Sequence, residues 1–451
     1  MSRAFIASSL SLVLLAATAR ADDWPQWLGP KRDGVWRETG ILDKFPKEGP
    51  KARWRKPIGA GYAGPAVVDG RVYIMDRQRA KDADGNPLKP EKGVIQGTER
   101  VLCLSAKDGS ILWKDEYDCP YKIYYPEGPR TTPLVHQGKV YTLGAMGHLR
   151  CHDAKTGKVQ WSKDLVATYK AKPPVWGYAS HLLVDGERLF SLAGGKDSAV
   201  VAFNKDTGKE LWKALDAEEI GYSPPTLCEA GGKKQLVVWL DTAIHGLNTE
   251  TGKEYWSKPY PAEGKPHRPA VPIATPVKAG DKLFVTSFYN GGMMFQFKAD
   301  KPDVTELWRG KSDNPEKPDT LHTTMTTSVI KDGHIYGMCA LGQLRCLKAD
   351  TGKQVWESLK VINGKKAIFG TAFFIRQGDR FFVFNDQGDL IIARLTPKAY
   401  EEVDRAHLLE PTLTTAGRSV VWSPPAFADK CIFVRNDKEI ICVSLAAKEK
   451  S

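Results

Sequence analysis

A short pattern that recurs along this chain constrains its fold more than any other feature. The best copies are HDAKTGKVQW (152–161), FNKDTGKELW (203–212), LNTETGKEYW (247–256) and LKADTGKQVW (347–356), with LSAKDGSILW (104–113) as a looser one. In each copy an acidic or amide side chain can accept backbone N–H bonds across a turn, and the glycine supplies the positive φ of a hairpin bulge. Such internal repeats indicate an array of similar structural units.

The tryptophans that end the copies set the size of the unit. They are Trp113, Trp161, Trp212, Trp256, Trp308 and Trp356, so successive ones lie 48, 51, 44, 52 and 48 residues apart. This period is typical of propellers rather than of helical solenoids. Short runs such as VYTLG have strand length and strand patterning, and no helical periodicity lasts beyond two turns. The fold class is therefore predicted to be all-β.

Each of these tryptophans is expected to fasten its sheet to the next one. A lone four-stranded sheet has no partner for such a ring, whereas a closed ring of sheets gives every blade a neighbour. Burying one indole removes about 150–250 Å² from water, which is about 4–6 kcal/mol as an upper bound.

Eight blades are predicted, and the ring is expected to close with strands from both chain ends. The blades are placed at 64–117, 130–165, 178–215, 222–260, 273–311, 322–359, 369–409 and 420–451. The last blade ends without a turn and tryptophan, and ARWRKPI at 52–58, with Trp54, is expected to supply its missing outer strand. Seven blades is the alternative if 369–409, which lacks the tryptophan, is not a blade.

The N-terminus has the form of a secretory signal peptide. Arg3 precedes the apolar stretch 4–17, and Ala19-Arg20-Ala21 matches an A-x-A cleavage site. The residue directly after that site is Asp22 and not a cysteine, and no later stretch approaches the ~18 apolar residues of a membrane span. We expect a soluble periplasmic or extracellular protein that is not a lipoprotein. Its parts are a signal peptide (1–21), an N-terminal extension packing on the propeller (22–51) and a single propeller domain (52–451).

The formal net charge is +12, but no run of five or more like charges occurs, so nucleic acid is not an expected partner. We expect a monomer without a transmembrane segment. Its expected partner is a small molecule, sugar or peptide at the mouth of the central channel, or another protein.

One repeat position holds a cysteine in four copies, Cys103, Cys151, Cys346 and Cys442. Other copies place Ala202 or Gly246 there, which indicates a small buried core position. Cys339 and Cys346 flank the ALGQL turn, so a disulfide across that hairpin is the alternative. The remaining three, Cys119, Cys228 and Cys431, have no assigned role.

The repeat G-x-V-Y…L-x-x-x-D-A-x-T-G-K-x-x-W resembles the pyrroloquinoline-quinone (PQQ)-like propeller repeat. The segments DWPQWLGPKRDGVW, FNDQGDLIIARLTPKAYEEVDRAHLLEPT and VVWSPPAF look like secreted members of that group. The resemblance covers essentially the whole mature chain and is specific for fold. The group contains quinoprotein alcohol dehydrogenases and a non-enzymatic outer-membrane assembly scaffold, so the resemblance implies no single activity.

In the dehydrogenases that the repeat resembles, the quinone lies on a tryptophan floor beneath a ring formed by two adjacent cysteines. Carboxylate and amide ligands hold a Ca²⁺ ion, and an Asp acts as base. This chain has no adjacent cysteine pair and no C-x-x-C-H haem motif, and neither the metal ligands nor the base can be matched to a motif. Trp176 in PPVWGYASH is the candidate floor. No cofactor is assigned, and PQQ with Ca²⁺ is the alternative.

The sequence also gives no support for a metal site or a nucleotide site. The nine histidines form no H-x-H or H-E-x-x-H pattern, so no metal site is predicted. GAGYAG at 59–64 fits G-x-G-x-x-G, but a strand pattern rather than a helix follows, which argues against a dinucleotide site.

The mouth of the channel is the candidate binding site. The loops that lead into the inner strands converge there, and they are rich in aromatic and cationic residues, which suits a sugar, a quinone or an anionic peptide. The candidates are Tyr125, Glu127, Arg130, Trp176, Tyr178, His181, Tyr222, His267, Arg268, His322 and Trp422. The alternative is that these residues only plug the channel.

The sequence thus predicts a secreted propeller that acts as a binding or scaffold module through the mouth of its channel. The alternative is a PQQ-dependent quinoprotein oxidoreductase acting on alcohols or sugars.

Overall fold

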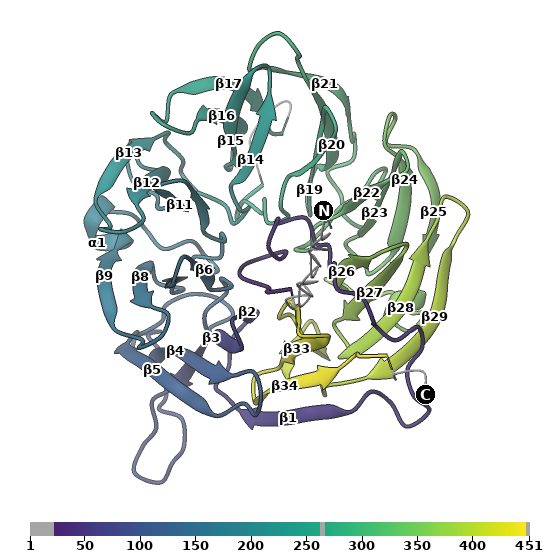
Figure 1. The fold of residues 1–451 in the computed structure, drawn as a ribbon. Helices are drawn as coiled ribbons and strands as arrows, with labels where there is room; N and C mark the ends of the chain where they lie inside the picture. The colour runs from purple at the N-terminus through teal and green to yellow at the C-terminus, as the bar shows by residue number, and fades with distance from the viewer. Residues whose placement is uncertain (1–21, 262–266, 448–451) are drawn as a thin grey trace, which may run out of the picture.

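Residues 22–261 and 267–447, which the computed structural model describes, form eight four-stranded antiparallel sheets in a ring (Figure 1). The all-β class and the eight blades predicted from the repeat are confirmed. The expected signal peptide at 1–21 lies outside the described residues.

The first four blades follow one another along the chain, each running from the centre of the ring outward. Blade 1 contains β2 (Ala66–Val68), β3 (Arg71–Arg79), β4 (Gly97–Ser105) and β5 (Ile111–Asp118). Blade 2 contains β6 (Leu134–His136), β7 (Lys139–Leu143), β8 (His148–Asp153) and β9 (Val159–Asp164). Blade 3 contains β10 (Leu183–Asp185), β11 (Arg188–Leu192), β12 (Val200–Asn204) and β13 (Glu210–Ala214). Blade 4 contains β14 (Thr226–Ala230), β15 (Lys233–Trp239), β16 (Ala243–Asn248) and β17 (Glu254–Pro259).

The next three blades repeat this order, and the eighth combines both ends of the chain. Blade 5 contains β18 (Val277–Ala279), β19 (Lys282–Ser287), β20 (Gly291–Phe297) and β21 (Val304–Arg309). Blade 6 contains β22 (Val329–Lys331), β23 (His334–Met338), β24 (Leu344–Lys348) and β25 (Gln354–Ser358). Blade 7 contains β26 (Ala372–Gln377), β27 (Arg380–Asn385), β28 (Asp389–Leu395) and β29 (Tyr400–His407). Blade 8 contains β32 (Ala426–Ala428), β33 (Cys431–Arg435), β34 (Glu439–Ser444) and β1 (Ala52–Pro57).

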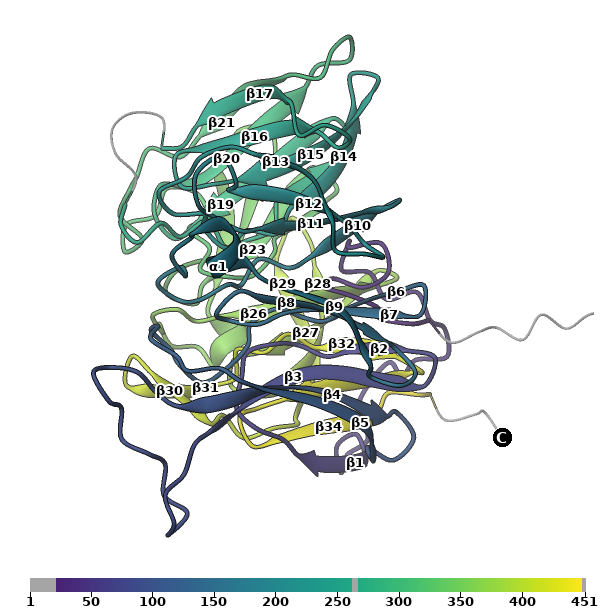
Figure 2. The ribbon, with the colours of Figure 1, turned by 90° about the vertical axis from the view of Figure 1, so that its left-hand side faces the viewer.

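A few elements lie outside the blades. A hairpin of β30 (Leu413–Thr415) and β31 (Arg418–Val420) connects blades 7 and 8. One turn of helix, α1 (Leu165–Tyr169), follows blade 2, and the 3-10 turn η1 (Lys360–Ile362) follows blade 6. Figure 2 shows the long connection between β3 and β4 projecting from the same side of the ring as the β30–β31 hairpin.

The ring closes as the sequence predicts, through an N-terminal strand in the last blade. Strand β1 pairs antiparallel with β34, and Trp54 lies opposite Cys442. The Trp54 indole N–H then donates to the carbonyl of Ala106 in blade 1, at 2.9 Å. The two ends of the chain therefore share one sheet, which protects both from fraying.

The same indole contact recurs around the ring. The Nε1 groups of Trp113, Trp161, Trp212, Trp308 and Trp356 donate to carbonyls in the next blade, at 2.7–3.1 Å. Except at Trp356, whose neighbouring turn TPKA (396–399) has no glycine, the indole also lies on the glycine of that turn: a Cβ added to Gly252 would stand 2.5 Å from the Trp212 ring. The T-G-K turn thus offers a buried indole both an acceptor and a surface without a side chain.

Trp256 departs from this arrangement. Its indole N–H donates instead to Gln235 of its own blade, at 2.7 Å, and its ring lies over Gly246. Phe297 of blade 5 meets the edge of the same indole, with ring centroids 6.5 Å apart. The contact between blades 4 and 5 is therefore apolar rather than hydrogen-bonded through the indole.

Blade 7 has an aspartate where the other blades have the tryptophan. The bulge in β29 places Asp404 opposite Ile392, as the bulge in β5 places Trp113 opposite Cys103. The Asp404 carboxylate accepts a 2.7 Å hydrogen bond from the backbone N–H of Phe45. The N-terminal extension therefore covers the junction of blades 7 and 8, where no further turn is available.

All eight cysteines are buried free thiols. The shared position is a small one in the middle of each sheet: Cys151, for example, pairs with Tyr141 on one side and Trp161 on the other. The disulfide considered between Cys339 and Cys346 does not form, because the register of β23 and β24 places Cys346 opposite Tyr336 and not opposite Cys339.

We predict that Trp212→Ala lowers the free energy of unfolding by about 3–5 kcal/mol, because the ring is 8% exposed and its cavity cannot collapse between two rigid sheets. Leu211→Ala is the matched control, since that neighbouring side chain is 46% exposed. Urea unfolding measures both variants. A loss below about 1 kcal/mol for Trp212→Ala would contradict a stabilising role of the indole between blades.

Candidate functional site

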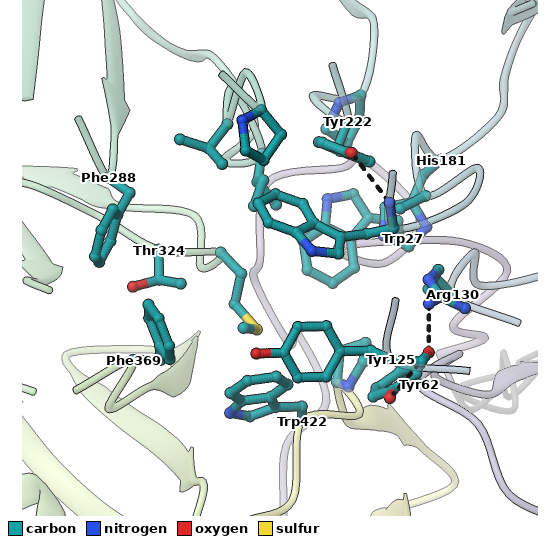
Figure 3. A pocket seen from close by; sticks show the side chains of 18 of the residues that line it. Trp27, Tyr62, Tyr125, Arg130, His181, Tyr222, Phe288, Thr324, Phe369 and Trp422 are labelled. Carbon is teal, nitrogen blue, oxygen red and sulfur yellow. Dashed lines mark hydrogen bonds between the residues drawn. The ribbon is translucent and has the colours of Figure 1, made fainter. Parts of the chain in front are cut away.

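A cavity of about 280 Å³ lies at the centre of the ring and is lined mainly by aromatic side chains. The segment that precedes the innermost strand of every blade contributes to its wall (Figure 3). In blade order these residues are Tyr62, Arg130, Trp176 and His181, Tyr222, Val271, Met325, Phe369, and Trp422. We call this cavity the aromatic cup.

The sequence explains why these segments point to one place. Prolines occur just before the inner strands, as at Pro65, Pro133, Pro224, Pro276 and Pro424. A residue that precedes proline is kept out of the helical region, so each segment approaches its strand with extended backbone. The segments therefore carry their large side chains to the axis of the ring.

Trp27, from the N-terminal extension, forms the floor of the cup. Its ring stacks on His181 with centroids 4.3 Å apart and planes 7° from parallel, and its indole N–H donates to Thr275 Oγ1 at 2.9 Å. Its neighbours Gln26 and Leu28 line a second cavity, of about 400 Å³, on the far side of this segment. The N-terminal extension thus closes the central channel beneath the cup.

His181 presents a single hydrogen-bond donor to the cup. The backbone N–H of Thr132 donates to its Nδ1 at 3.0 Å, which places the ring proton on Nε2. Burial, reinforced by the positive charge of Arg32, holds the pKa of His181 well below its usual range, so the ring is neutral. Within the described part of the chain, no hydrogen bond engages Nε2, which leaves this N–H for a ligand.

Arg130 is the one cationic side chain in the wall of the cup, as far as the described residues show. Its guanidinium donates to the carbonyls of Gly128, Tyr124 and Tyr125, and its Cζ lies 5.0 Å from the centroid of the Tyr62 ring. These contacts fix the guanidinium at the edge of the cup, where its charge can meet one anionic group.

Six of the residues predicted for the channel mouth line the cup. They are Tyr125, Arg130, Trp176, His181, Tyr222 and Trp422. Trp176, the candidate floor, lies in the wall instead: its ring is tilted against Tyr222 with centroids 5.3 Å apart, and Trp27 takes the floor position.

The structure places the other five candidates outside the lining. His267 stacks behind Tyr289 with centroids 4.2 Å apart, and buried His322 makes a 3.0 Å contact with the carbonyl of Phe288. These two histidines support the rings that face the cup. Glu127 is half-buried near Tyr62. Burial raises the pKa of that phenol, the positive charge of Arg130 opposes the rise, and the negative charge of Glu127 supports it.

Tyr178 and Arg268 point away from the cup. The Tyr178 hydroxyl donates to the carbonyl of Ala193 at 2.6 Å, and the ring is part of the core of blades 2 and 3. Arg268 forms ion pairs with Asp241 and Glu218, each at 2.8 Å.

Seven large lining residues were not predicted from the sequence, namely Trp27, Tyr62, Phe288, Tyr289, Met325, Phe369 and Phe373. Tyr62, Met325 and Phe369 lie in segments just before an inner strand, so examining that segment in every blade identifies them. Phe288 and Tyr289 lie in the β19–β20 turn, and Trp27 comes from outside the repeats, so the repeat offered no signal for them.

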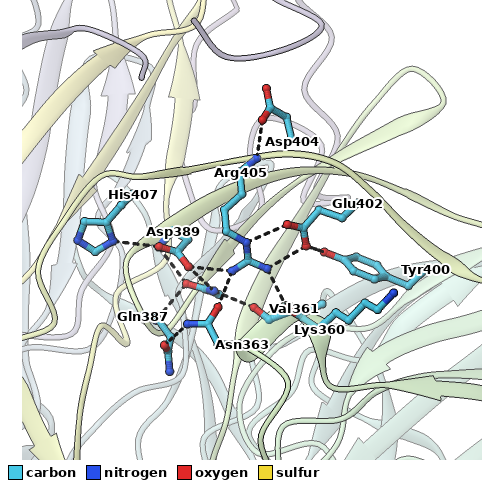
Figure 4. Close-up of polar contacts among 11 residues, drawn as sticks. Lys360, Val361, Asn363, Gln387, Asp389, Tyr400, Glu402, Asp404, Arg405 and His407 are labelled. Carbon is cyan, nitrogen blue, oxygen red and sulfur yellow. Dashed lines mark hydrogen bonds and ion pairs between the residues drawn. The ribbon is translucent and has the colours of Figure 1, made fainter. Parts of the chain in front are cut away.

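A second polar cluster lies in blade 7 (Figure 4). The Arg405 guanidinium binds Glu402 on one side and Asp389 on the other, and it donates to the carbonyl of Lys360 at 2.8 Å. Burial alone disfavours its charge, but the bonds to Glu402 and Asp389 raise the pKa of Arg405. Asp389 also contacts His407 Nδ1, at 2.9 Å. Because each charged group is already partnered, the cluster holds β28, β29 and the η1 turn together and offers no free group for a ligand.

The cup does not suit PQQ with Ca²⁺. Calcium takes about 6–8 oxygen ligands, with carboxylates prominent among them. The described residues that line the cup include no Asp or Glu, and PQQ itself carries several carboxylates that a single Arg130 would have to balance. The lining instead suits an apolar ring with few polar groups.

The chain is similar in sequence to several known proteins. A family model described as outer membrane protein assembly factor BamB matches residues 97–318 and 196–451. Quinohemoprotein alcohol dehydrogenase ADH-IIG of Pseudomonas putida is 33% identical over 160 residues, which is 34% of this chain and 19% of that protein. BamB of Salmonella typhimurium is 27% identical over 120 residues, which is 26% of this chain and 27% of that protein. The matched segments thus span about a fifth to about a quarter of these relatives.

Solved structures show the same fold. BamB from Moraxella catarrhalis superposes with a TM-score of 0.52 at 14% identity, covering 88% of this chain and 98% of that one. Quinohemoprotein alcohol dehydrogenase ADHIIG from Pseudomonas putida HK5 gives a TM-score of 0.56 at 13% identity, covering 95% and 81%. Among residues 22–261 and 267–447, no helix has the length and apolar character that a membrane crossing needs.

The buried neutral His181 makes stability depend on pH. An unfolded histidine binds a proton near pH ~6.5, whereas the native ring resists protonation, so stability is present above that pH and is lost as the pH falls below it. The slope reaches at most about 1.4 kcal/mol per pH unit for one such group. We predict that His181→Gln reduces this slope in urea unfolding between neutral and mildly acidic pH. It does not abolish the slope, because burial also lowers the pKa of His322. Equal slopes in wild type and variant would contradict the assignment.

Proposed function

Because the chain belongs to the PQQ-like propeller family described by the BamB model, we propose that it is an exported binding module whose aromatic cup holds one planar, largely apolar ligand. The observation that carries this proposal is the composition of the cup. All eight blades and the N-terminal extension supply its lining, and most of the large side chains are aromatic. Among the described residues, none accepts a hydrogen bond from the neutral N–H of His181.

The shape and polarity of the cup favour a ring system over a sugar. A sugar presents many hydroxyls, which proteins commonly bind with carboxylate and amide side chains, and no Asp, Glu, Asn or Gln is found among the described lining residues. Flat apolar surfaces instead stack or meet edge to face with aromatic side chains. A volume of about 280 Å³ suits a small ring system. Such a ligand can carry an acceptor for His181 and one anionic group for Arg130.

Export is part of the proposal and rests on the N-terminal sequence. The charge of Arg3, the apolar stretch that follows and the A-x-A site are the parts of a secretory signal. The similarity to outer membrane protein assembly factor BamB supports the same location. Detection of a mature chain that begins at Asp22 in the periplasm or medium tests this part.

We predict that menadione, a neutral naphthoquinone, binds saturably and quenches tryptophan fluorescence, because Trp27, Trp176 and Trp422 line the cup. Trp176→Leu and Tyr222→Leu should each weaken binding by about tenfold, or about 1.4 kcal/mol, through loss of one ring face. Tyr255→Leu is the control, since that half-buried phenol lies on β17 and outside the cup. Quenching that does not saturate, or equal affinity in all four proteins, would overturn the proposal.

A quinoprotein oxidoreductase is the second candidate, favoured by the 33% identity to the quinohemoprotein alcohol dehydrogenase. The lining of the cup opposes it. Adding PQQ and Ca²⁺ and following dye reduction with a panel of alcohols and aldoses separates the two functions. Dye reduction that Trp422→Leu abolishes would replace the binding proposal with the enzymatic one.

A further inference from the structure

A buried cluster of possible metal ligands lies between blades 1 and 2, away from the lining of the cup. Glu99 is on β4, Cys119 directly follows β5, and His148 begins β8. One ligand atom from each residue lies within 4.8 Å of the other two. The three come from separate strands, so no short motif in the sequence reveals them, and Cys119 had no role in the repeat.

We propose that Glu99, Cys119 and His148 form a zinc site. The contact between Cys119 Sγ and His148 Nδ1 measures 3.5 Å. In tetrahedral zinc sites the Zn–S and Zn–N distances are about 2.3 Å and about 2.0 Å, which separates sulfur from nitrogen by about 3.5 Å. The two softer ligands therefore already stand at the spacing that one Zn²⁺ ion requires, and a Glu99 oxygen lies within 4.8 Å of both ligand atoms.

The surroundings position these ligands. The Glu99 carboxylate accepts hydrogen bonds from the Tyr117 hydroxyl at 2.5 Å, from the Ala145 N–H at 2.9 Å and from the Tyr121 hydroxyl. Glu99 is fully buried, and these bonds fix its rotamer. The Tyr117 ring also packs against the His148 ring, with centroids 5.2 Å apart. Supporting contacts of this kind orient metal ligands in proteins.

Charge and access are compatible with a divalent cation. A cysteine binds zinc as the thiolate, so the thiol proton of Cys119 has to leave. Zinc binding displaces that proton to solvent and leaves a thiolate and a carboxylate, which together balance the two charges of the ion. His148 is only half-buried, so the ion can enter past it and a water molecule can complete the tetrahedron.

The position of the site suggests what the ion does. Cys119 begins the segment that carries Tyr125 and Arg130 to the cup, and Arg77 also holds this segment through the carbonyl of Pro126, at 3.4 Å. A bound zinc ion would join the start of that segment to β8 of the next blade. The site is independent of the proposed ligand in the cup.

Co²⁺ titration of the full-length mature protein, freed of metal with a chelator, tests the site. We expect one Co²⁺ per chain and a near-ultraviolet thiolate-to-cobalt charge-transfer band, which zinc then removes by displacement. Cys119→Ala should abolish the band, and His148→Gln should weaken Co²⁺ binding by at least about tenfold. Cys228→Ala is the matched control, because that thiol is equally buried but lies in blade 4.

Circular dichroism establishes that each variant is folded. If Cys119→Ala does not fold, His148→Gln still tests the site, because the His148 side chain is only half-buried. Zinc should raise the melting temperature of wild type and the control, but not that of His148→Gln. Absence of the charge-transfer band in wild type, or its persistence in folded Cys119→Ala, would overturn the proposal. In that case the 3.5 Å contact is a thiol–imidazole hydrogen bond only.

Discussion

The indole N–H group of one blade reaches a backbone carbonyl of the next, and the rest of this structure depends on that contact. An indole has one donor and no acceptor, so when it is buried it must find an oxygen. Six blade junctions provide the same solution, with Trp54, Trp113, Trp161, Trp212, Trp308 and Trp356 as donors. Each bond therefore ties the outer strand of one blade to the next blade.

The two junctions without this contact show what replaces it. Between blades 4 and 5 the indole of Trp256 turns back to Gln235, and the contact across the junction is apolar. Between blades 7 and 8 the aspartate at the tryptophan position binds the backbone of Phe45. At this second junction the N-terminal extension replaces the missing turn. Its residues Trp24, Trp27 and Trp36 belong to the apolar cluster that also contains the core of blade 8.

This use of the N-terminal extension links the stability of the ring to the shape of the cup. The same segment that covers the last junction places Trp27 beneath the cavity and against His181. The N-terminal extension thereby closes the channel beneath the cup. The segments that form its wall run directly into the inner strands of the blades, so the aromatic faces are held in position before any ligand arrives, which lowers the entropic cost of binding.

The repeat by itself determined the all-β class, the eight blades and the closure through Trp54, because strand patterning recurs along the chain and the turn chemistry recurs in most units, without long-range information. It also indicated that the segments before the inner strands meet at the mouth of the channel, and this predicted Trp176, Tyr222 and Trp422 as lining residues. Only the tertiary structure decided that Trp27 forms the floor, that Tyr178 and Arg268 turn away, and that Glu99, Cys119 and His148 converge. The physical reason is distance along the chain. These positions are set by packing between segments that are far apart in sequence. The periodicity within one segment does not encode which way a side chain faces another segment.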